Sequence, residues 1–236
     1  MISLPILYRD EWLVAVDKPP GIHVHPTAFS PNEDSCVRML RDQLGQWVFT
    51  IHRLDRATSG VLLFALNSDV ATAISAQFAG REVKKRYLAI VRGYLPEGEQ
   101  RIDRPLREEP HLPPAEAITV YRRLATGEIP VPTGKFPTSR FSLAEVLPQT
   151  GRKNQIRRHL AGISHPIIGD VQFGDGRQNR IFRENLDSRQ LLLLAMNLEI
   201  THPVSAKILQ ISAPLPQEFR KIFAAFGWPE TVVPRW

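Results

Sequence analysis

The chain has 236 residues, of which 43% are hydrophobic, and it carries a formal net charge of +6. This length allows one large core with at most a small appendage, and the composition excludes a disordered chain. The single cysteine, Cys36, excludes a disulfide framework and a cysteine-rich zinc site, and it predicts a reducing, cytoplasmic location.

Export and membrane insertion are not expected from the sequence pattern. The first residues, MISLPILYRDEW, lack the basic stretch and following apolar stretch of a signal peptide. No apolar run approaches the roughly 18 to 20 residues that span a bilayer, so we expect no membrane association. The positive charge suits a nucleic-acid partner, although many proteins without such a partner are also mildly basic.

The first 95 residues alternate extended and helical patterns. Gly45 is a good residue to end a helix, and Ser68, Asp69 and Gly80 fit the N-cap, the first turn and the end of another. The predicted elements are extended segments at 6–10 and 12–21, a helix at 35–45, a strand at 61–67, a helix at 68–80 and a strand at 85–95.

Residues 96–150 differ in composition, because nine of the twenty prolines lie there. The segment still contains strand-like stretches at 117–125 and 139–148. We therefore expect loops and hairpins that elaborate one sheet, so that residues 1–236 form a single domain with a proline-rich elaboration at about 96–150.

The remaining segments complete the fold prediction. They are a helix at 152–162, strands at 191–201 and 207–214, and a closing helix at 217–227. Strands and helices follow one another without strict alternation. This order predicts an α+β fold with a mixed or largely antiparallel sheet and flanking helices.

The stretch HRLDRATSG, residues 52–60, places four ionisable side chains directly before a buried strand. Asp55, Thr58 and Ser59 could simply make the hydrogen bonds of a turn. A turn does not need Arg53 and Arg56 beside the carboxylate, however. Two guanidinium groups favour the ionised carboxylate and can bind phosphates, so Asp55 is also a candidate catalytic group.

A second basic cluster lies in TGRKNQIRRHL, residues 150–160. Arg152 and Lys153 are expected at the N-terminus of the predicted helix, where positive charge opposes the helix dipole. Arg157 and Arg158 continue the basic face. The cluster is either a solvated helix face or a phosphate-binding surface that also supplies a partner for a buried carboxylate.

Other candidate groups have simpler explanations. Tyr87 in the strand 85–95 is either a core residue or an aromatic group that stacks on a base. His23 and His25 could share a strand face, but without a third ligand nearby we do not expect a metal site. Cys36 is predicted on a helix, with no adjacent base to activate it.

Three segments together resemble the motifs of the RluA family of RNA pseudouridine synthases. They are HRLDRATSGVLL (52–63), KKRYLAIVRG (84–93) and TGRKNQIRRHLAGISHPIIGD (150–170), and the opening residues 7–25 add to the likeness. The resemblance extends from about residue 5 to the end. It implies an α+β fold with a mixed, mainly antiparallel central sheet and a central catalytic cleft.

A finer likeness points to the tRNA pseudouridine synthase C branch of that family. It is carried by residues 45–56, 130–141, 165–170 and 174–180. This branch is implied to convert a uridine at position 65, in the T-stem of transfer RNA. A ribosomal-RNA pseudouridine synthase, a non-catalytic RNA-binding protein and an N-glycosidase that releases uracil remain alternatives.

The resemblance assigns roles to four residues. It implies that Asp55 is the catalytic carboxylate and that Arg157 pairs with it. Arg53 would enter the RNA stack as the target base leaves, and Tyr87 would pack against that base and is a proposed base for its C5 proton. The basic clusters add Arg56, Arg152, Lys153 and Arg158 as expected RNA contacts.

One position departs from the family pattern. Asn154 stands where members usually carry histidine, so we expect a positioning or phosphate-contact role there and not a proton transfer. The resemblance implies no metal and no organic cofactor. It also implies an RNA substrate, no membrane partner and a monomer.

Overall fold

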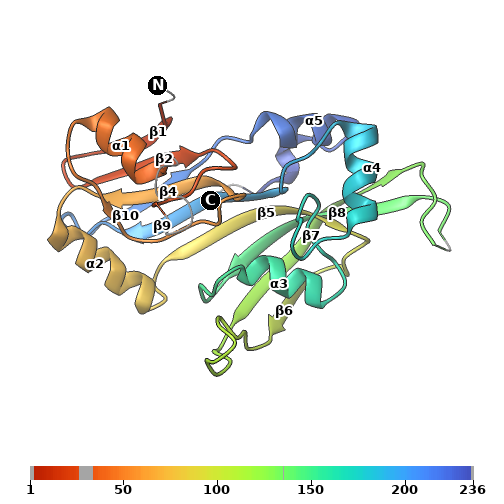
Figure 1. The fold of residues 1–236 in the computed structure, drawn as a ribbon, viewed down its shortest axis with the longest axis horizontal. Helices are drawn as coiled ribbons and strands as arrows, with labels where there is room; N and C mark the ends of the chain where they lie inside the picture. The colour runs from red at the N-terminus through yellow and green to blue at the C-terminus, as the bar shows by residue number, and fades with distance from the viewer. Residues whose placement is uncertain (1–2, 27–33, 135, 235–236) are drawn as a thin grey trace. The chain divides into compact units, whose positions relative to one another are not determined.

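The computed structural model describes residues 3–26, 34–134 and 136–234, which divide into two compact units (Figure 1). Unit 1 consists of Met1–Lys85 and Leu194–Pro214, and unit 2 consists of Arg86–Leu193 and Leu215–Trp236. Both units are therefore discontinuous in sequence. Met1 and Ile2 of the N-terminal segment, and Lys135 within 130–141, lie outside the described residues.

Unit 1 is built on a sheet in the order β1-β2-β4-β9, with β3 paired to β4 and β10 paired to β9. All seven residues of β4 are buried, as its uninterrupted apolar sequence predicts for a central strand. The strands are β1 (Ile6–Arg9), β2 (Leu13–Lys18), β3 (Phe49–Thr50), β4 (Ser59–Ala65), β9 (Leu193–Thr201), which begins in unit 2, and β10 (Ile208–Ser212).

Two helices accompany these strands, α1 (Cys36–Leu44) and α2 (Ser68–Ala79). The Ser35 side chain caps α1, and Gly45 ends it in the left-handed conformation at φ 67°. The prediction that Ser68 caps α2 is wrong. The side chain of Asn67 accepts the Val70 N–H at 2.9 Å instead, because an amide oxygen caps as well as a hydroxyl.

Unit 2 contains an antiparallel sheet in the order β5-β8-β7-β6. The strands predicted at 117–125 and 139–148 are confirmed, and the first runs further, to Ile129. The chain passes from unit 1 into unit 2 within β5. The strands are β5 (Lys84–Arg92), β6 (Glu99–Asp103), β7 (Ile118–Ile129) and β8 (Ser139–Pro148).

Helices cover both faces of this sheet. Phe141 of β8 contacts Phe182 and Phe226 on one face, with ring centroids 4.6 and 6.1 Å away. Figure 1 shows α3 and α5 on opposite sides of the strands of unit 2. The helices are α3 (Gln155–Gly162), α4 (Gly176–Leu186) and α5 (Gln217–Phe226), followed by a short 3-10 helix at Glu230–Val232.

The strand directions agree with the predicted fold class. β4 and β9 run parallel, whereas the other pairs named above are antiparallel. Over the residues that the structure describes, the chain therefore has an α+β fold with mixed, mainly antiparallel pairing and five α-helices. Among the described helices, none has the length and apolarity that a bilayer crossing requires.

A buried polar network attaches α3 to β7. The ring of His159 bonds the Thr119 hydroxyl through Nδ1 and the Arg104 carbonyl through Nε2, each at 2.9 Å. Because a carbonyl only accepts, Nε2 carries the proton and Nδ1 accepts from Thr119. Gln155 donates to the Ile118 carbonyl at 2.9 Å, so both helix side chains are fixed to one strand.

Gly60 permits the close pairing of β4 with β9. Its φ is +108°, and a Cβ added there would lie 2.1 Å from the Ala195 carbonyl oxygen. A side chain would therefore meet both backbone strain and a direct overlap with a neighbouring strand. Gly60 follows the candidate catalytic turn, so this contact also fixes the end of that turn.

We expect Gly60→Ala to lower the free energy of unfolding by roughly 2 to 5 kcal/mol, because strain and overlap add. Gly45→Ala is the matched control in unit 1, since its φ is also positive but nothing lies within 4 Å of its added Cβ. That control should cost about 1 to 2 kcal/mol. Urea unfolding followed by circular dichroism measures both, and equal losses would contradict the account of the overlap.

Stability should also fall as the pH is lowered, because burial lowers the pKa of His159. An unfolded histidine takes up a proton near its ordinary pKa of about 6.5, whereas the folded ring stays neutral below that pH. Its stabilisation is complete above about 6.5 and declines below it.

The comparison of wild type with His159→Gln between about pH 7.5 and pH 5 isolates this effect. The other histidines are the same in both proteins, so the difference in slope belongs to His159. The variant should be less stable at the higher pH and lose less on acidification. Parallel slopes would show that His159 does not contribute.

Candidate functional site

The turn that carries Asp55 is built around a buried lysine. Lys18, at the end of β2, has no exposed surface, and its ammonium group donates to the backbone carbonyls of Pro19 at 2.9 Å, Arg56 at 3.0 Å and Thr58 at 2.8 Å. An ammonium group has three N–H donors, so each has an acceptor. Two of the three carbonyls belong to the turn, which is thereby held against β2.

The charge of Lys18 also acts on the turn. Burial lowers the pKa of Lys18 to about 8, while attraction to the Asp55 carboxylate opposes that shift. At neutral pH the amine is still mostly protonated. Unit 1 therefore places a fixed positive charge where it attracts the Asp55 carboxylate.

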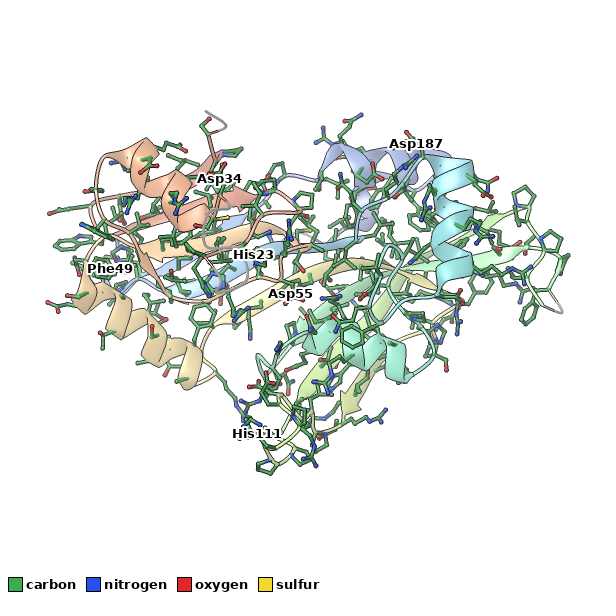
Figure 2. The ribbon with its side chains drawn as sticks, viewed as in Figure 1. His23, Asp34, Phe49, Asp55, His111 and Asp187 are labelled. Atoms are coloured by element: carbon green, nitrogen blue, oxygen red, sulfur yellow. The ribbon has the colours of Figure 1, made fainter. Side chains whose placement is uncertain are left out.

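Asp55 itself is half-buried, and its carbonyl accepts the Thr58 N–H at 3.1 Å. Arg56 makes a reciprocal pair with Gly21, in which Nε donates to the Gly21 carbonyl and the Gly21 N–H donates to the Arg56 carbonyl, both at 2.8 Å. Figure 2 shows Asp55 on the connection into β4, away from Phe49 on β3. The turn is thus closed by local bonds as well as by Lys18.

His52 anchors the start of this segment. Its Nε2 accepts the Leu63 N–H at 3.0 Å, and its ring stacks on Phe78 with centroids 4.9 Å apart. Burial, together with the positive charge of Lys85, lowers the pKa of His52 to about 3. His52 is therefore a neutral packing residue at physiological pH, whereas the neighbouring Arg53 is exposed to solvent.

Tyr87 lies on β5, half-buried and opposite Val146 of β8. Strand alternation places it on the face of unit 2 that α3 covers. On the other face, Arg86 forms an ion pair with Glu145 at 2.9 Å and donates to the Pro234 carbonyl at 3.0 Å. These bonds fix the strand directly beside Tyr87.

Arg157, in the first turn of α3, is held by the side chains of two other residues. Its Nε and Nη2 donate to Asp170 at 2.7 and 2.9 Å, and its Nη1 donates to Asn154 Oδ1 at 2.7 Å. The guanidinium carbon lies 5.2 Å from the centre of the Phe173 ring. Only 8% of Arg157 is exposed, so this cation has one defined orientation.

The expected RNA contacts of the same region adjoin the proline-rich segment 107–116. The prediction that Arg152 and Lys153 stand in the helix is wrong, because α3 begins at Gln155 and the left-handed Asn154 precedes it. The bonds to the segment are Arg152 Nε to Glu116 O (3.1 Å), Lys153 Nζ to Glu109 Oε1 (3.1 Å) and Arg158 Nη1 to Arg107 O (2.9 Å).

The predicted site residues thus fall into two groups. Unit 1 carries Arg53, Asp55 and Arg56 on one turn, and unit 2 carries Tyr87, Arg152, Lys153, Arg157 and Arg158. The pairing of Arg157 with Asp55 and the central cleft stay predictions.

Two residues of the site were missed from the sequence. Lys18 has a recognisable signal, since it is a charged residue that ends an apolar strand before Pro-Pro-Gly. Asp170 follows the apolar HPIIG and has a weaker signal, because its partner Arg157 lies thirteen residues away on another element. In the ranges 3–26, 34–134 and 136–234, no three His, Cys, Asp or Glu side chains are grouped as a metal site.

Comparison with known proteins identifies the family of the chain. The sequence profile of the family described as RNA pseudouridylate synthase matches residues 12–162. The chain is 45% identical to tRNA pseudouridine synthase C of Vibrio vulnificus (strain CMCP6), with 98% of each chain covered. It is 48% identical to tRNA pseudouridine synthase C of Salmonella typhi, over 95% of this chain and 90% of that protein.

Solved structures share the fold. Human RNA Pseudouridylate Synthase Domain Containing 1 superposes with a TM-score of 0.73 at 23% identity, covering 91% of this chain and 84% of that one. Human RNA Pseudouridylate Synthase Domain Containing 4 gives 0.72 at 24% identity, over 94% and 93% of the two chains. From these matches, together with the sequence motifs, the chain belongs to the RNA pseudouridylate synthase family and is a pseudouridine synthase, an isomerase.

Proposed function

We propose that this chain isomerises a uridine of transfer RNA to pseudouridine, at position 65 in the T-stem. The observation that carries the choice of transfer RNA is the identity of 45 to 48% with proteins named tRNA pseudouridine synthase C, over nearly the whole chain. The position rests on the resemblance carried by residues 45–56, 130–141, 165–170 and 174–180.

The reaction breaks the N1–C1′ glycosidic bond, rotates the uracil and joins C5 to C1′. The proton on C5 is lost, N1 gains a proton, and the mass of the RNA is unchanged. Asp55 acts either as a nucleophile at C1′ or as a base and electrostatic stabiliser of a sugar intermediate, and both routes need the ionised carboxylate. The buried ammonium of Lys18 and the closed turn support a carboxylate held in one place.

The remaining roles follow the chemistry of each side chain. Tyr87 packs against the target base and is the proposed base for its C5 proton, and Arg157 supplies the cation for the catalytic carboxylate. A uridine in a stem must be flipped out before it can react, at a cost of a few kcal/mol. Arg53 is exposed and lies two residues before Asp55, so it fills the vacated gap in the RNA stack.

Phosphate recognition is assigned to Arg56, Arg152, Lys153 and Arg158. The ion pair of Lys153 with Glu109 is solvent-exposed, with 57% and 49% of the two side chains accessible. Such a surface pair contributes little stability, so a phosphate can replace the carboxylate. A-form RNA hides its base edges in the deep groove, and recognition by phosphate and shape suits a stem target.

Other parts of the proposal concern the whole protein. We take residues 1–236 as one catalytic domain, with 96–150 as an elaboration, that acts as a monomer in the cytoplasm without a metal or organic cofactor. The single cysteine supports a reducing compartment, because one cysteine cannot form a disulfide within the chain. Cys36 is buried, and burial raises the pKa of its thiol to about 11, so the thiol is unreactive.

The Asp55→Ala variant tests the chemistry. With unmodified transfer RNA carrying tritium at uridine C5, wild type should release tritium to water. The variant should be slower by at least about 10³-fold, the scale of loss of a catalytic group, while it still binds RNA. Asp34→Ala, at an exposed position of unit 1, is the control and should release tritium at the wild-type rate. Release by the Asp55 variant at that rate would refute the assignment.

The target position is tested with transfer RNA in which uridine 65 is replaced by cytidine. We expect tritium release from the unaltered RNA and none from the replaced one, because a single position is modified. Release from both transfer RNAs would refute position 65. If neither transfer RNA releases tritium but labelled ribosomal RNA does, ribosomal RNA is the substrate. Binding without release would indicate an RNA-binding protein, and loss of uracil mass would indicate a glycosidase.

A further inference from the structure

The guanidinium of Arg157 is bound more completely than a simple ion pair requires. All three of its nitrogen atoms donate to oxygen atoms of Asp170 or Asn154, and the ring of Phe173 lies beside it. A two-point bond to a carboxylate fixes the plane of a guanidinium, and the third bond fixes its other edge. Arg157 therefore cannot swing between orientations without breaking several bonds.

Asp170 is fixed as firmly as the arginine that it binds. Its side chain is only 1% exposed, and Oδ1 also accepts the backbone N–H groups of Gln172 at 2.9 Å and Phe173 at 3.0 Å. Burial alone would raise the pKa of Asp170, but Arg157 and these two N–H groups lower it below its ordinary value. The carboxylate therefore stays charged throughout the physiological range.

The loop that carries Asp170 has no room to adapt. A Cβ on Gly169 would lie 1.8 Å from the Gln190 carbonyl oxygen, and a Cβ on Gly174 would lie 1.9 Å from the carbonyl oxygen of Asp170 itself. Asn179 accepts the Gly169 N–H at 2.8 Å and donates to the Asp170 carbonyl at 2.9 Å. The backbone on both sides of the carboxylate is thus held in place.

Asn154 contributes the second partner at the expense of a helix cap. It stands at the N-cap of α3, yet its side chain makes no capping bond and accepts from Arg157 Nη1 instead. Its backbone is left-handed at φ +55°, which asparagine tolerates better than most residues. Both features are costly for helix stability and useful for holding the arginine.

We propose that Asp170 and Asn154 are positioning residues that hold the Arg157 guanidinium in a single orientation for the reaction. The inference rests on the proposed function of Arg157. Buried ion pairs are often no more stabilising than apolar residues of the same size, so stability alone does not account for three bonds to one cation. Preorganisation accounts for these three bonds, because a cation that is already oriented loses no conformational freedom as the reaction proceeds.

The test is single-turnover tritium release from transfer RNA labelled at uridine C5, measured with the RNA affinity of each variant. Asp170→Asn keeps an oxygen for the Gln172 and Phe173 N–H groups but loses the charge and one acceptor for Arg157. We expect the rate constant to fall on the order of 10²-fold, as for a small misplacement of a reacting group, with RNA affinity unchanged.

Asp175→Asn is the matched control. Asp175 also pairs with an arginine, Arg92, at 2.7 Å, and it also accepts two backbone N–H groups, those of Arg177 and Gln178. It touches neither Arg157 nor Asn154 in any bond given above, so its variant should keep the wild-type rate. An equal loss in the two variants would mean a general effect on unit 2 and would overturn the inference.

Asn154→Gly serves as the second variant if Asp170→Asn does not fold. Glycine accepts a positive φ without strain, so this change removes the oxygen and relieves the backbone. It should slow release by a smaller factor and leave affinity unchanged. Wild-type rates in the folded Asn154 and Asp170 variants would overturn the proposal.

Combination with Arg157→Gln separates this inference from the proposed function. If Asp170 acts through Arg157, the double variant Arg157→Gln with Asp170→Asn should be no slower than Arg157→Gln alone. If the double variant instead loses rate by the product of the two single losses, Asp170 does not act through Arg157. That result would overturn the positioning role while leaving Arg157 essential. A wild-type rate for Arg157→Gln would instead refute the role given to Arg157 in the proposed function, and this inference with it.

Discussion

The ammonium group of Lys18 is the interaction on which the candidate catalytic turn depends. A charge without solvent exposure is tolerated only when its donors are satisfied, and here three backbone carbonyls do so. Because two of these carbonyls lie on either side of residue 57, the turn cannot open without leaving a buried cation bare. The position of Asp55 is thus set by β2, an element far from it in sequence, and the neighbouring β4 supplies the rigid support behind it.

Unit 2 also contains a buried cation whose donors are hydrogen-bonded, but the chemical groups differ. Arg157, like Lys18, is a nearly buried cation with acceptors on each nitrogen, but its acceptors are side chains of Asp170 and Asn154. Backbone carbonyls hold a lysine where the chain itself must be shaped, whereas a carboxylate holds an arginine where the orientation of a planar group matters. Each unit therefore gives one functional segment a defined geometry through a desolvated positive charge.

Periodicity and stop signals predicted most of the elements, because strands such as β4 are apolar on both faces and helices such as α1 carry ordinary caps. Prediction failed where two adjacent residues could cap the same helix, since Asn67 and not Ser68 caps α2. It also failed at the start of α3, where the left-handed Asn154 delays the helix until Gln155. Helix α4 was missed because it is largely polar and buries few residues. The motifs indicated Asp55, Tyr87 and Arg157, but local sequence does not encode which distant group each cation meets, so Lys18 and Asp170 needed the structure.

The discontinuity of both units has a consequence for how the chain acquires its structure. Unit 1 takes its first segment from Met1–Lys85 and its second from Leu194–Pro214, so Gly60 meets Ala195 only after the long segment between them has been synthesised. Unit 2 likewise closes with residues that follow Pro214. Contacts between distant segments form slowly, because a long loop must be ordered first. An emerging chain would therefore carry the complete Asp55 motif on the ribosome without the strand that finishes its support, and that support would arise only after Leu194–Pro214 have been synthesised.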